Sequence, residues 1–349
     1  MAPVVDSHVH IFPFLDEPSG FGSQRAHRQF LQLYMANHGE PVRRLRDHGR
    51  VTEQTLHNGA LTSPANLTDV NFRVGKYGRF EWTVGDEDLY IQFFPPSLQD
   101  MTSPAEFMLQ QMARVGVDMA VLQNARLYGR LNDFFAQAVH AHPGKFIGLA
   151  DVNEPQPDIA ELRRAVTTLG LKGVYYAGRG HFTSGYAHTF DSSIFDPLWE
   201  EVASLGIPVF WELFGDGDID RLARWMRKWP TIPCVWTHGF DPAVLSQMPE
   251  DLQRLLQHDQ LTVEILYPIH WARNHEYPFS ELRPALATLY QHCGGERLIW
   301  GSDMPNVERN CTYRQSLHYL RVLAEGVIPS RDLDRILGLT TLRLFGVGD

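Results

Sequence analysis

The sequence predicts an α/β fold, a (β/α)8 TIM barrel with a β-containing insertion after its first strand. Eight short runs rich in Val, Ile and Leu recur along the 349 residues, and stretches with helical spacing separate most of them. The runs are nearly continuously apolar, which is typical of parallel strands covered by helices. A doubly wound sheet is disfavoured, because VDSHVHIF continues into FPFLDEPSG without a glycine-rich turn for phosphate.

The individual elements follow from this pattern in chain order. We expect strands at residues 3–9, 117–123, 146–152, 172–176, 207–213, 232–239, 261–268 and 297–303. Amphipathic stretches predict helices at residues 103–114, 157–169, 195–205 and 218–229. Ser103 before Pro104 and Asp196 before Pro197 are the expected caps at two helix starts.

The regular alternation breaks once, after the first strand. Residues from about 12 to 101 separate the first strand from the second, far more than a crossover needs. Within them, residues 71–94 alternate aromatic side chains around glycine-containing turns, which predicts a small antiparallel sheet. We therefore expect one barrel domain over residues 1–349 with this insertion. It would either cover the active site or serve as a decorative or oligomer-forming element.

Composition restricts the class of function. The net charge is −10 and no run of basic residues occurs, which disfavours a nucleic-acid partner. No apolar stretch approaches the length of a membrane span, and the first residues do not resemble a signal peptide. Cys234, Cys293 and Cys311 are scattered, which fits a reducing compartment. These features predict a cytoplasmic enzyme with a small-molecule substrate and no membrane partner; a homodimer stays an open alternative.

His8 and His10 are the strongest candidate metal ligands. They lie two residues apart in an extended run, and the side-chain period of a strand puts both on one face. Barrel chemistry is located at the carboxyl ends of the strands, where this run ends. Because neutral imidazole suits zinc, iron and related ions, the pair predicts a metal site.

Other strands also end in side chains that bind metals or transfer protons. Asp303 closes the last strand in WGSDMP, where a metal, a transferred proton or a helix N-cap would offset the cost of burying a carboxylate. His238 in VWTHGF either ligates a metal, polarises the substrate or is a buried, hydrogen-bonded histidine. Glu212 in PVFWELF either contacts the metal or forms an ion pair. We expect Glu264 in LTVEILYP to face the helices.

Five residues are candidates for binding the substrate. Tyr175, Tyr176 and Arg179 lie at or after the end of the fourth strand and could meet a ring or a carboxylate. Trp211 lies near the end of the fifth strand. Arg309 follows the last strand, and its guanidinium suits bidentate contact with a carboxylate.

These motifs together resemble the amidohydrolase superfamily. The resemblance runs through DSHVHIF, GVDMAVLQ, HPGKFIGLADV, FDPLWEEVASLGIPVF, VWTHGF and LIWGSDMP, and it covers nearly all of the chain outside the insertion. The branch it resembles is the amidohydrolase-2 group, which includes aminocarboxymuconate-semialdehyde decarboxylase, resorcylate-type decarboxylases and lactonases. Its (β/α)8 barrel agrees with the fold expected above.

The resemblance implies a divalent metal held by His8, His10 and Asp303, with His238 assisting the substrate or catalysis. This chain departs from the family on the fifth strand, where Glu212 stands in place of the usual ligating histidine. Glu212 could replace it as an oxygen ligand, or bridge two ions with His238 serving the second; the site could also be degraded. Zinc is the expected ion, with iron or manganese as alternatives.

Two chemistries and one non-catalytic role fit this resemblance. A hydrolase would use metal-activated water on an ester, thioester, lactone, amide or C–C bond of a small carboxylate-bearing or hydrophobic substrate, with Asp303 transferring the proton. A non-oxidative decarboxylase would act on an aromatic or enoic hydroxy acid, with Asp303 or His238 protonating carbon. The third alternative is a binding protein that keeps the barrel without catalysis.

Overall fold

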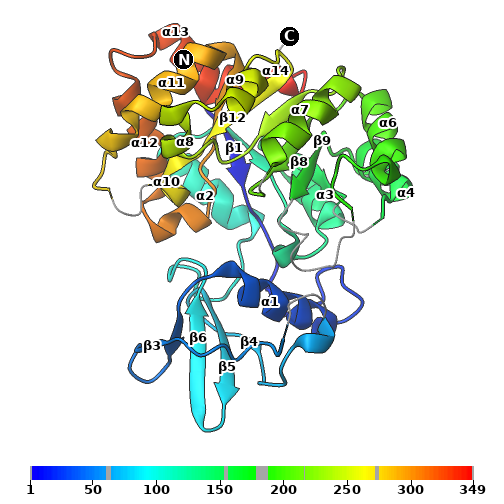
Figure 1. Ribbon diagram of the computed structural model, residues 1–349, viewed down its shortest axis with the longest axis vertical. Helices are drawn as coiled ribbons and strands as arrows, with labels where there is room; N and C mark the ends of the chain where they lie inside the picture. The colour runs from blue at the N-terminus through cyan, green and yellow to red at the C-terminus, as the bar shows by residue number, and fades with distance from the viewer. Residues whose placement is uncertain are drawn as a thin grey trace.

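The computed structural model describes residues 2–59, 64–152, 156–177, 188–215, 217–271 and 275–347. Within these residues eight parallel strands form the predicted barrel, in the order β1-β7-β8-β9-β10-β11-β12-β13 (Figure 1). The strands are β1 (Val5–Val9), β7 (Met119–Leu122), β8 (Phe146–Asp151), β9 (Gly173–Ala177), β10 (Val209–Glu212), β11 (Cys234–Trp236), β12 (Leu261–Ile265) and β13 (Leu298–Trp300). Each lies inside or overlaps an expected run, so the fold prediction is confirmed.

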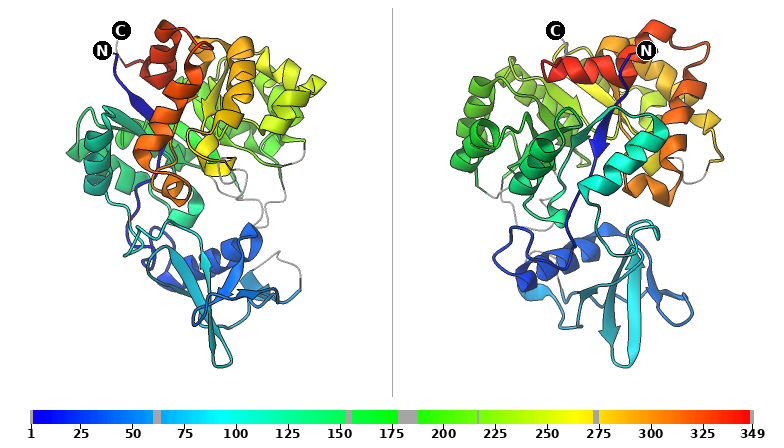
Figure 2. Two further views of the ribbon diagram at one scale, coloured as in Figure 1. Left: turned by 90° about the vertical axis from the view of Figure 1, so that its left-hand side faces the viewer. Right: turned by 180° about the vertical axis from the view of Figure 1, so that it is seen from behind.

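Helices surround the barrel on its outside (Figure 2). They are α2 (Ala105–Val115), α3 (Asn132–Ala141), α4 (Ile159–Arg163), α6 (Asp196–Leu205), α7 (Asp218–Lys228), α8 (Pro242–Gln247), α9 (Glu250–Leu256), α10 (Tyr267–His270), α11 (Arg283–Cys293), α12 (Tyr313–Ala324), α13 (Ser330–Asp334) and α14 (Thr340–Leu344). Shorter helical turns are η1 (Pro64–Asn66), η2 (Arg126–Tyr128), η3 (Arg164–Thr168), η4 (Ser193–Phe195), η6 (Ser280–Leu282), η7 (Gly295–Arg297), η8 (Asn306–Arg309) and η9 (Arg335–Leu339). In the described part of the chain, no helix has both the length and the apolar character that crossing a membrane requires.

The two expected helix caps are wrong. The Ser103 hydroxyl donates to the carbonyl oxygen of His10 at 3.1 Å, and its backbone pairs with Phe12, so it ties α2 to the end of β1. Asp196 lies inside the first turn of α6, where its carboxylate accepts a hydrogen bond from Nζ of Lys228 at 2.5 Å. Tertiary contacts thus use both polar side chains that the local pattern assigned to capping.

The barrel closes where β1 meets the chain that leaves β13. Val9 forms a parallel bridge with Met304. The backbone N–H of Asp303 donates to the carbonyl of His8 at 2.9 Å, and that of His10 donates to the carbonyl of Met304 at 2.7 Å. These contacts form a closing seam between the first and last strands, and they place His8, His10 and Asp303 side by side.

The insertion forms a second, antiparallel sheet with one long helix. Its elements are α1 (Gln24–His38), β2 (Val42–Arg44), β3 (Arg50–Val51), β4 (Arg73–Val74), β5 (Arg79–Val84) and β6 (Glu87–Gln92), and the strand order is β3-β2-β6-β5-β4. Phe80 and Trp82 alternate with more exposed residues on β5 and are fully buried. The small antiparallel sheet predicted for residues 71–94 is confirmed by β4, β5 and β6, whereas α1, β2 and β3 were not expected.

The insertion lies at the carboxyl ends of the barrel strands, at the end of the molecule opposite both chain termini (Figure 1). Its buried apolar side chains belong to the same continuous core as those of the helical layer. A smaller cluster fills the barrel interior, formed by Val5, Val121, Ile147, Leu149, Tyr175, Ala177, Phe210, Val235 and Ile299. The insertion is therefore packed against the face where barrel enzymes carry out chemistry.

Candidate active site

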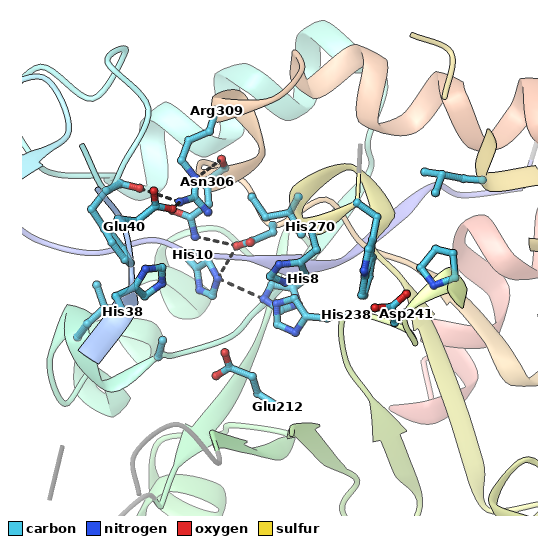
Figure 3. A pocket seen from close by; sticks show the side chains of 18 of the residues that line it. His8, His10, His38, Glu40, Glu212, His238, Asp241, His270, Asn306 and Arg309 are labelled. Carbon is cyan, nitrogen blue, oxygen red and sulfur yellow. Dashed lines mark hydrogen bonds and ion pairs between the residues drawn. The ribbon is translucent and has the colours of Figure 1, made fainter. Parts of the chain in front are cut away.

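One pocket of about 660 Å³ opens at the carboxyl ends of the strands, and the five side chains predicted to bind metal or to act in catalysis line it (Figure 3). His8 is on β1, and His10 follows it. Glu212 is the last residue of β10, His238 follows β11 and Asp303 follows β13. The structure therefore brings together all five candidate metal-binding or catalytic residues around one space.

Three of these side chains form a compact set of potential metal ligands. His8 Nε2 and His10 Nε2 are 3.2 Å apart, and His10 Nε2 is 2.9 Å from Asp303 Oδ1. All three residues are buried, and their ligand atoms lie within 4.8 Å of one another. Two imidazole nitrogens and one carboxylate oxygen suit zinc, iron or manganese.

Hydrogen bonds on the far side of each ring fix which nitrogen can bind a metal. His10 Nδ1 lies 2.7 Å from the carbonyl oxygen of Gln123, which can only accept, so Nδ1 carries the proton. His8 Nδ1 lies 2.8 Å from Glu264 Oε2 and donates to it in the same way. When both rings are neutral, their Nε2 lone pairs face each other and Asp303. This arrangement is repulsive unless a proton or a metal cation lies among them, so the residues present fit a divalent metal.

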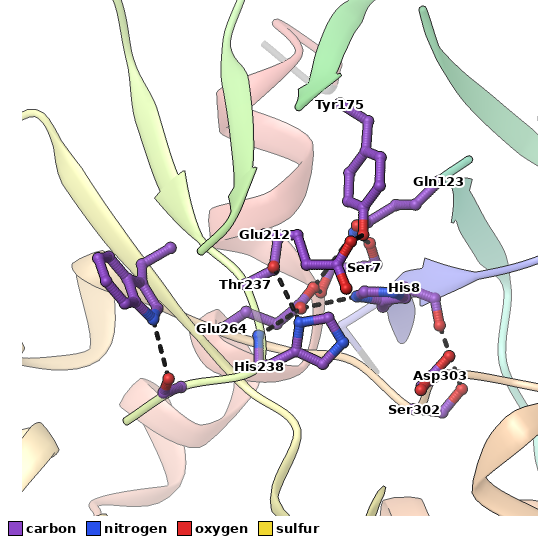
Figure 4. Close-up of polar contacts among 12 residues, drawn as sticks. Ser7, His8, Gln123, Tyr175, Glu212, Thr237, His238, Glu264, Ser302 and Asp303 are labelled. Carbon is purple, nitrogen blue, oxygen red and sulfur yellow. Dashed lines mark hydrogen bonds and ion pairs between the residues drawn. The ribbon is translucent and has the colours of Figure 1, made fainter. Parts of the chain in front are cut away.

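Glu264 faces the barrel interior, and the expectation that it faces the helices is wrong. Its Oε2 accepts hydrogen bonds from His8 Nδ1 and from the backbone N–H of His238, the latter at 3.2 Å. Its Oε1 accepts hydrogen bonds from Ser7 Oγ at 2.5 Å and Gln123 Nε2 at 3.4 Å (Figure 4). The neighbours of Glu264 on β12, Val263 and Ile265, pack in the core shared with the helices. The strand period therefore carried the signal that places Glu264 inside.

The protonation of this cluster favours positive charge at its centre. Burial lowers the pKa of His8, but the Glu264 carboxylate more than offsets this and raises it to about 9. Burial raises the pKa of Asp303, but its hydrogen bond with His10 lowers it to about 2. A metal cation supplies the same charge that these shifts favour.

Glu212 and His238 line the pocket but lie outside the compact set of three. Glu212 Oε2 accepts a hydrogen bond from the Tyr175 hydroxyl at 2.9 Å. Burial, and then the Glu212 charge, raises the pKa of Tyr175 well above its usual value, so the phenol stays a donor. The ring of His238 is centred 4.8 Å from that of His8. Glu212 and His238 therefore line the same pocket as the compact set of three, where a molecule bound beside that set could contact them.

The proton on His238 can also be placed by its partners. Thr237 Oγ1 donates to the carbonyl of Trp211 at 2.9 Å, so it accepts from His238 Nδ1 at 3.0 Å. This arrangement leaves the lone pair of the neutral His238 ring on Nε2. His238 and Asp303 both have left-handed backbones, with φ of 66° and 64°. Such strain in non-glycine residues is concentrated at functional sites.

The structure separates the five substrate-binding candidates. Tyr175 and Arg309 line the pocket. Tyr176 and Trp211 do not, because their rings pack against each other, 5.2 Å apart, in the apolar core shared with the helices. Arg179 lies outside the described residues. Neighbouring strand residues point to opposite faces, which is why Tyr175 lies inside and Tyr176 outside.

Four pocket residues come from the insertion and were missed by the sequence analysis: Tyr34, His38, Glu40 and Phe93. Tyr34 and His38 lie on the last turns of α1, a helix that the pattern did not reveal. The only available signal was the position of the insertion directly after the first strand. The insertion thus forms part of the pocket wall, and its role as a cover for an active site stays a prediction.

Comparison with known proteins identifies the family. A family model described as Amidohydrolase matches residues 5–347, nearly the whole chain. The chain therefore belongs to the amidohydrolase family, whose metal-dependent enzymes include hydrolases and decarboxylases.

Individual relatives represent both kinds of reaction. A 2-amino-3-carboxymuconate-6-semialdehyde decarboxylase from Dictyostelium discoideum is 36% identical over 104 residues, which are 28% of this chain and only 27% of that protein. A structure from Pseudomonas putida, a candidate 2-pyrone-4,6-dicarboxylic acid hydrolase, covers 99% of this chain and 98% of its own with a TM-score of 0.61 and 19% identity. A 5-carboxyvanillate decarboxylase from Sphingomonas paucimobilis covers 71% of this chain and 84% of its own with a TM-score of 0.52 and 18% identity. At these identities the two structures demonstrate a shared fold.

Proposed function

We propose that the protein is a metal-dependent hydrolase acting on an ester, lactone or related bond of a small carboxylate-bearing substrate. The observation that carries this proposal is the convergence of His8 Nε2, His10 Nε2 and Asp303 Oδ1, with both rings oriented by partners that accept from Nδ1. When bound by these residues, a divalent metal polarises a carbonyl and acidifies water. The nitrogen and oxygen donors favour zinc, with iron or manganese as alternatives.

The chain's own side chains supply the proton transfers. Asp303 would accept the proton of the attacking water and deliver it to the leaving group, while Asn306 Nδ2 holds its Oδ1 at 2.8 Å. His238 Nε2 would accept a hydrogen bond from the attacking water or a substrate hydroxyl, with Thr237 holding its Nδ1. Glu212 is proposed as a further ligand or a second proton acceptor, held by Tyr175.

Decarboxylation is the second candidate, and the identity with the Dictyostelium decarboxylase favours it. In this reaction the substrate carboxylate leaves as carbon dioxide, and a proton taken up from solvent by His238 Nε2 or Asp303 would replace it on carbon. The same residues serve both reactions, because each requires a bound carboxylate or carbonyl oxygen and a nearby proton carrier.

The two candidates are separated by what happens to the substrate. We would incubate the metal-loaded protein in ¹⁸O-labelled water with 2-pyrone-4,6-dicarboxylic acid, 2-amino-3-carboxymuconate-6-semialdehyde and 5-carboxyvanillate, and follow the products by mass spectrometry. We expect ¹⁸O to enter the product of the lactone, which loses no carbon dioxide. Release of carbon dioxide without ¹⁸O incorporation would establish the decarboxylase instead. No turnover of any substrate, with metal still bound, would favour the binding protein.

A further inference from the structure

The insertion builds one side of the pocket from aromatic side chains. Tyr34 and His38 come from α1, and Phe93 follows β6. Their ring centroids are 5.8 Å apart for Tyr34 and His38, 5.9 Å for Tyr34 and Phe93, and 4.6 Å for His38 and Phe93. We call these three residues the aromatic wall. Figure 3 shows His38 on the side of the pocket opposite His238 and Asp241.

Arg309 lies at the edge of the aromatic wall. Its guanidinium is centred 5.8 Å from the ring of Phe93, and its Nη1 donates to the carbonyl of that residue at 3.0 Å. Glu40 Oε1 is 3.6 Å from the same Nη1, an ion pair longer than a hydrogen bond. Among the described residues that line the pocket, Arg309 is the one lysine or arginine. Its side chain is only 18% exposed, so an entering carboxylate meets a weakly solvated cation.

The wall is connected to the candidate metal ligands through η8. Arg309 Nε donates to the carbonyl of Asn306 at 3.4 Å, and Asn306 Nδ2 donates to Asp303 Oδ1 at 2.8 Å. A second tether joins Ser97 Oγ, just after the insertion sheet, to Glu308 Oε2 at 2.7 Å. The insertion therefore has a defined position relative to the site of chemistry.

We propose that the insertion is the substrate-recognition element and that the substrate is a planar, unsaturated or aromatic acid. Its plane packs on the aromatic wall, and one carboxylate binds Arg309 in place of Glu40. Arg309 has five N–H donors and makes two hydrogen bonds to described residues, so its planar guanidinium has donors for a bidentate carboxylate. This inference rests on the proposed function, because it places the substrate beside His8, His10 and Asp303.

Two dicarboxylates with the same carboxylate positions, one on a planar aromatic ring and one on a puckered saturated ring, test the proposal without turnover. Isothermal titration calorimetry on the full-length, metal-loaded protein would compare isophthalate with its saturated counterpart, hexahydroisophthalate. We expect the wild type to bind the planar probe about three- to tenfold more tightly, because only a flat ring stacks on the wall. Phe93→Leu and Tyr34→Leu should remove this preference, whereas Phe93→Tyr should keep it.

The charge at the edge of the wall is tested by the same titrations. Arg309→Gln should weaken the binding of both probes by roughly tenfold or more and leave the preference between them unchanged. Glu40→Gln should strengthen both, because it removes the carboxylate that competes for Arg309. Arg321→Gln, at an exposed position on α12, is the matched control and should bind both probes as the wild type does.

A wild type without a planar preference, or an Arg309→Gln variant that binds as tightly as the wild type, would overturn the proposal. Because binding is measured directly, the outcome is separate from that of the proposed function. The expected binding pattern without any turnover would support the recognition role and reject the hydrolase. Turnover without the expected binding pattern would support the hydrolase and reject the recognition role of the insertion.

Discussion

Glu264 Oε2 lies 2.8 Å from Nδ1 of His8, and both residues are fully buried. The same oxygen accepts the backbone N–H of His238. One carboxylate on β12 therefore orients an imidazole on β1 and holds the strand end that presents a second one. A carboxylate in this position also raises the basicity of Nε2, the nitrogen on the opposite side of the ring.

Glu264→Gln should weaken metal binding by about 10- to 100-fold, because it keeps the shape of the side chain but removes the charge that orients His8. Competition against a chromophoric chelator measures this affinity. Glu250→Gln, whose side chain is 80% exposed in its pair with Arg254, is the control and should bind metal normally. Equal affinities for Glu264→Gln and the wild type would contradict the orienting role.

His8→Ala should abolish metal retention, whereas Glu212→Gln should lower the affinity by about tenfold and leave the ion count at one per chain. The reason is that His8 belongs to the compact ligand set and Glu212 does not. Elemental analysis of protein purified without added metal checks both. Nearly two ions per wild-type chain, with one lost in Glu212→Gln, would instead indicate a bridged pair.

Trp211→Phe should reduce stability without changing substrate affinity. Trp211 is fully buried and packs against Tyr176, Trp199 and Trp225, so a smaller ring leaves a cavity that costs roughly 2 kcal/mol. Chemical denaturation gives the free energy of unfolding, and KM gives the effect on the substrate. A raised KM with unchanged stability in Trp211→Phe would contradict this prediction and indicate that Trp211 contacts the substrate.

The three cysteines should resist thiol reagents until the protein unfolds. Burial raises the pKa of Cys234 and Cys311 to about 12 and that of Cys293 to about 11. At pH 8 the native thiols stay protonated, so labelling by a disulfide reagent should be slow in buffer and rapid in guanidinium.

The same shifts fix the sign of a pH effect on stability. Below about pH 8.5 the thiols are protonated in both states and contribute no pH dependence. Above it the unfolded thiols ionise first, so the free energy of unfolding should fall as the pH rises toward 11 and 12. Rapid labelling of all three thiols in native protein at pH 8 would contradict these assignments.

The barrel could be predicted because its strands are mostly buried runs of three to six residues that lie within longer apolar stretches of the sequence. The elements β2 and β3 have three and two residues that are only partly buried or exposed, and α1 carries polar residues throughout, so no apolar run marks them. The hairpin of β5 and β6 was recognisable because buried and more exposed residues alternate on β5.

The pocket residues also divide into those that the sequence predicts and those that it does not. His8, His10 and Asp303 could be identified because spacing and strand ends carry information along the chain. The choice between Tyr175 and Tyr176 required the face of β9, and the pairing of Tyr176 with Trp211 across β9 and β10 places both on the outer face. The residues of the aromatic wall depend on how the insertion docks, which no local pattern encodes.

The closing seam gives the candidate ligands a second significance. His8 and His10 belong to the first strand of the barrel and Asp303 follows the last, so the set lies across the joint where the ring of strands is completed. An ion bound there would cross-link the first and last strands and close a loop that contains most of the polypeptide. Removing the ion with a chelator would then destabilise the barrel as well as stop its chemistry, and the melting temperature would rise with the concentration of free metal.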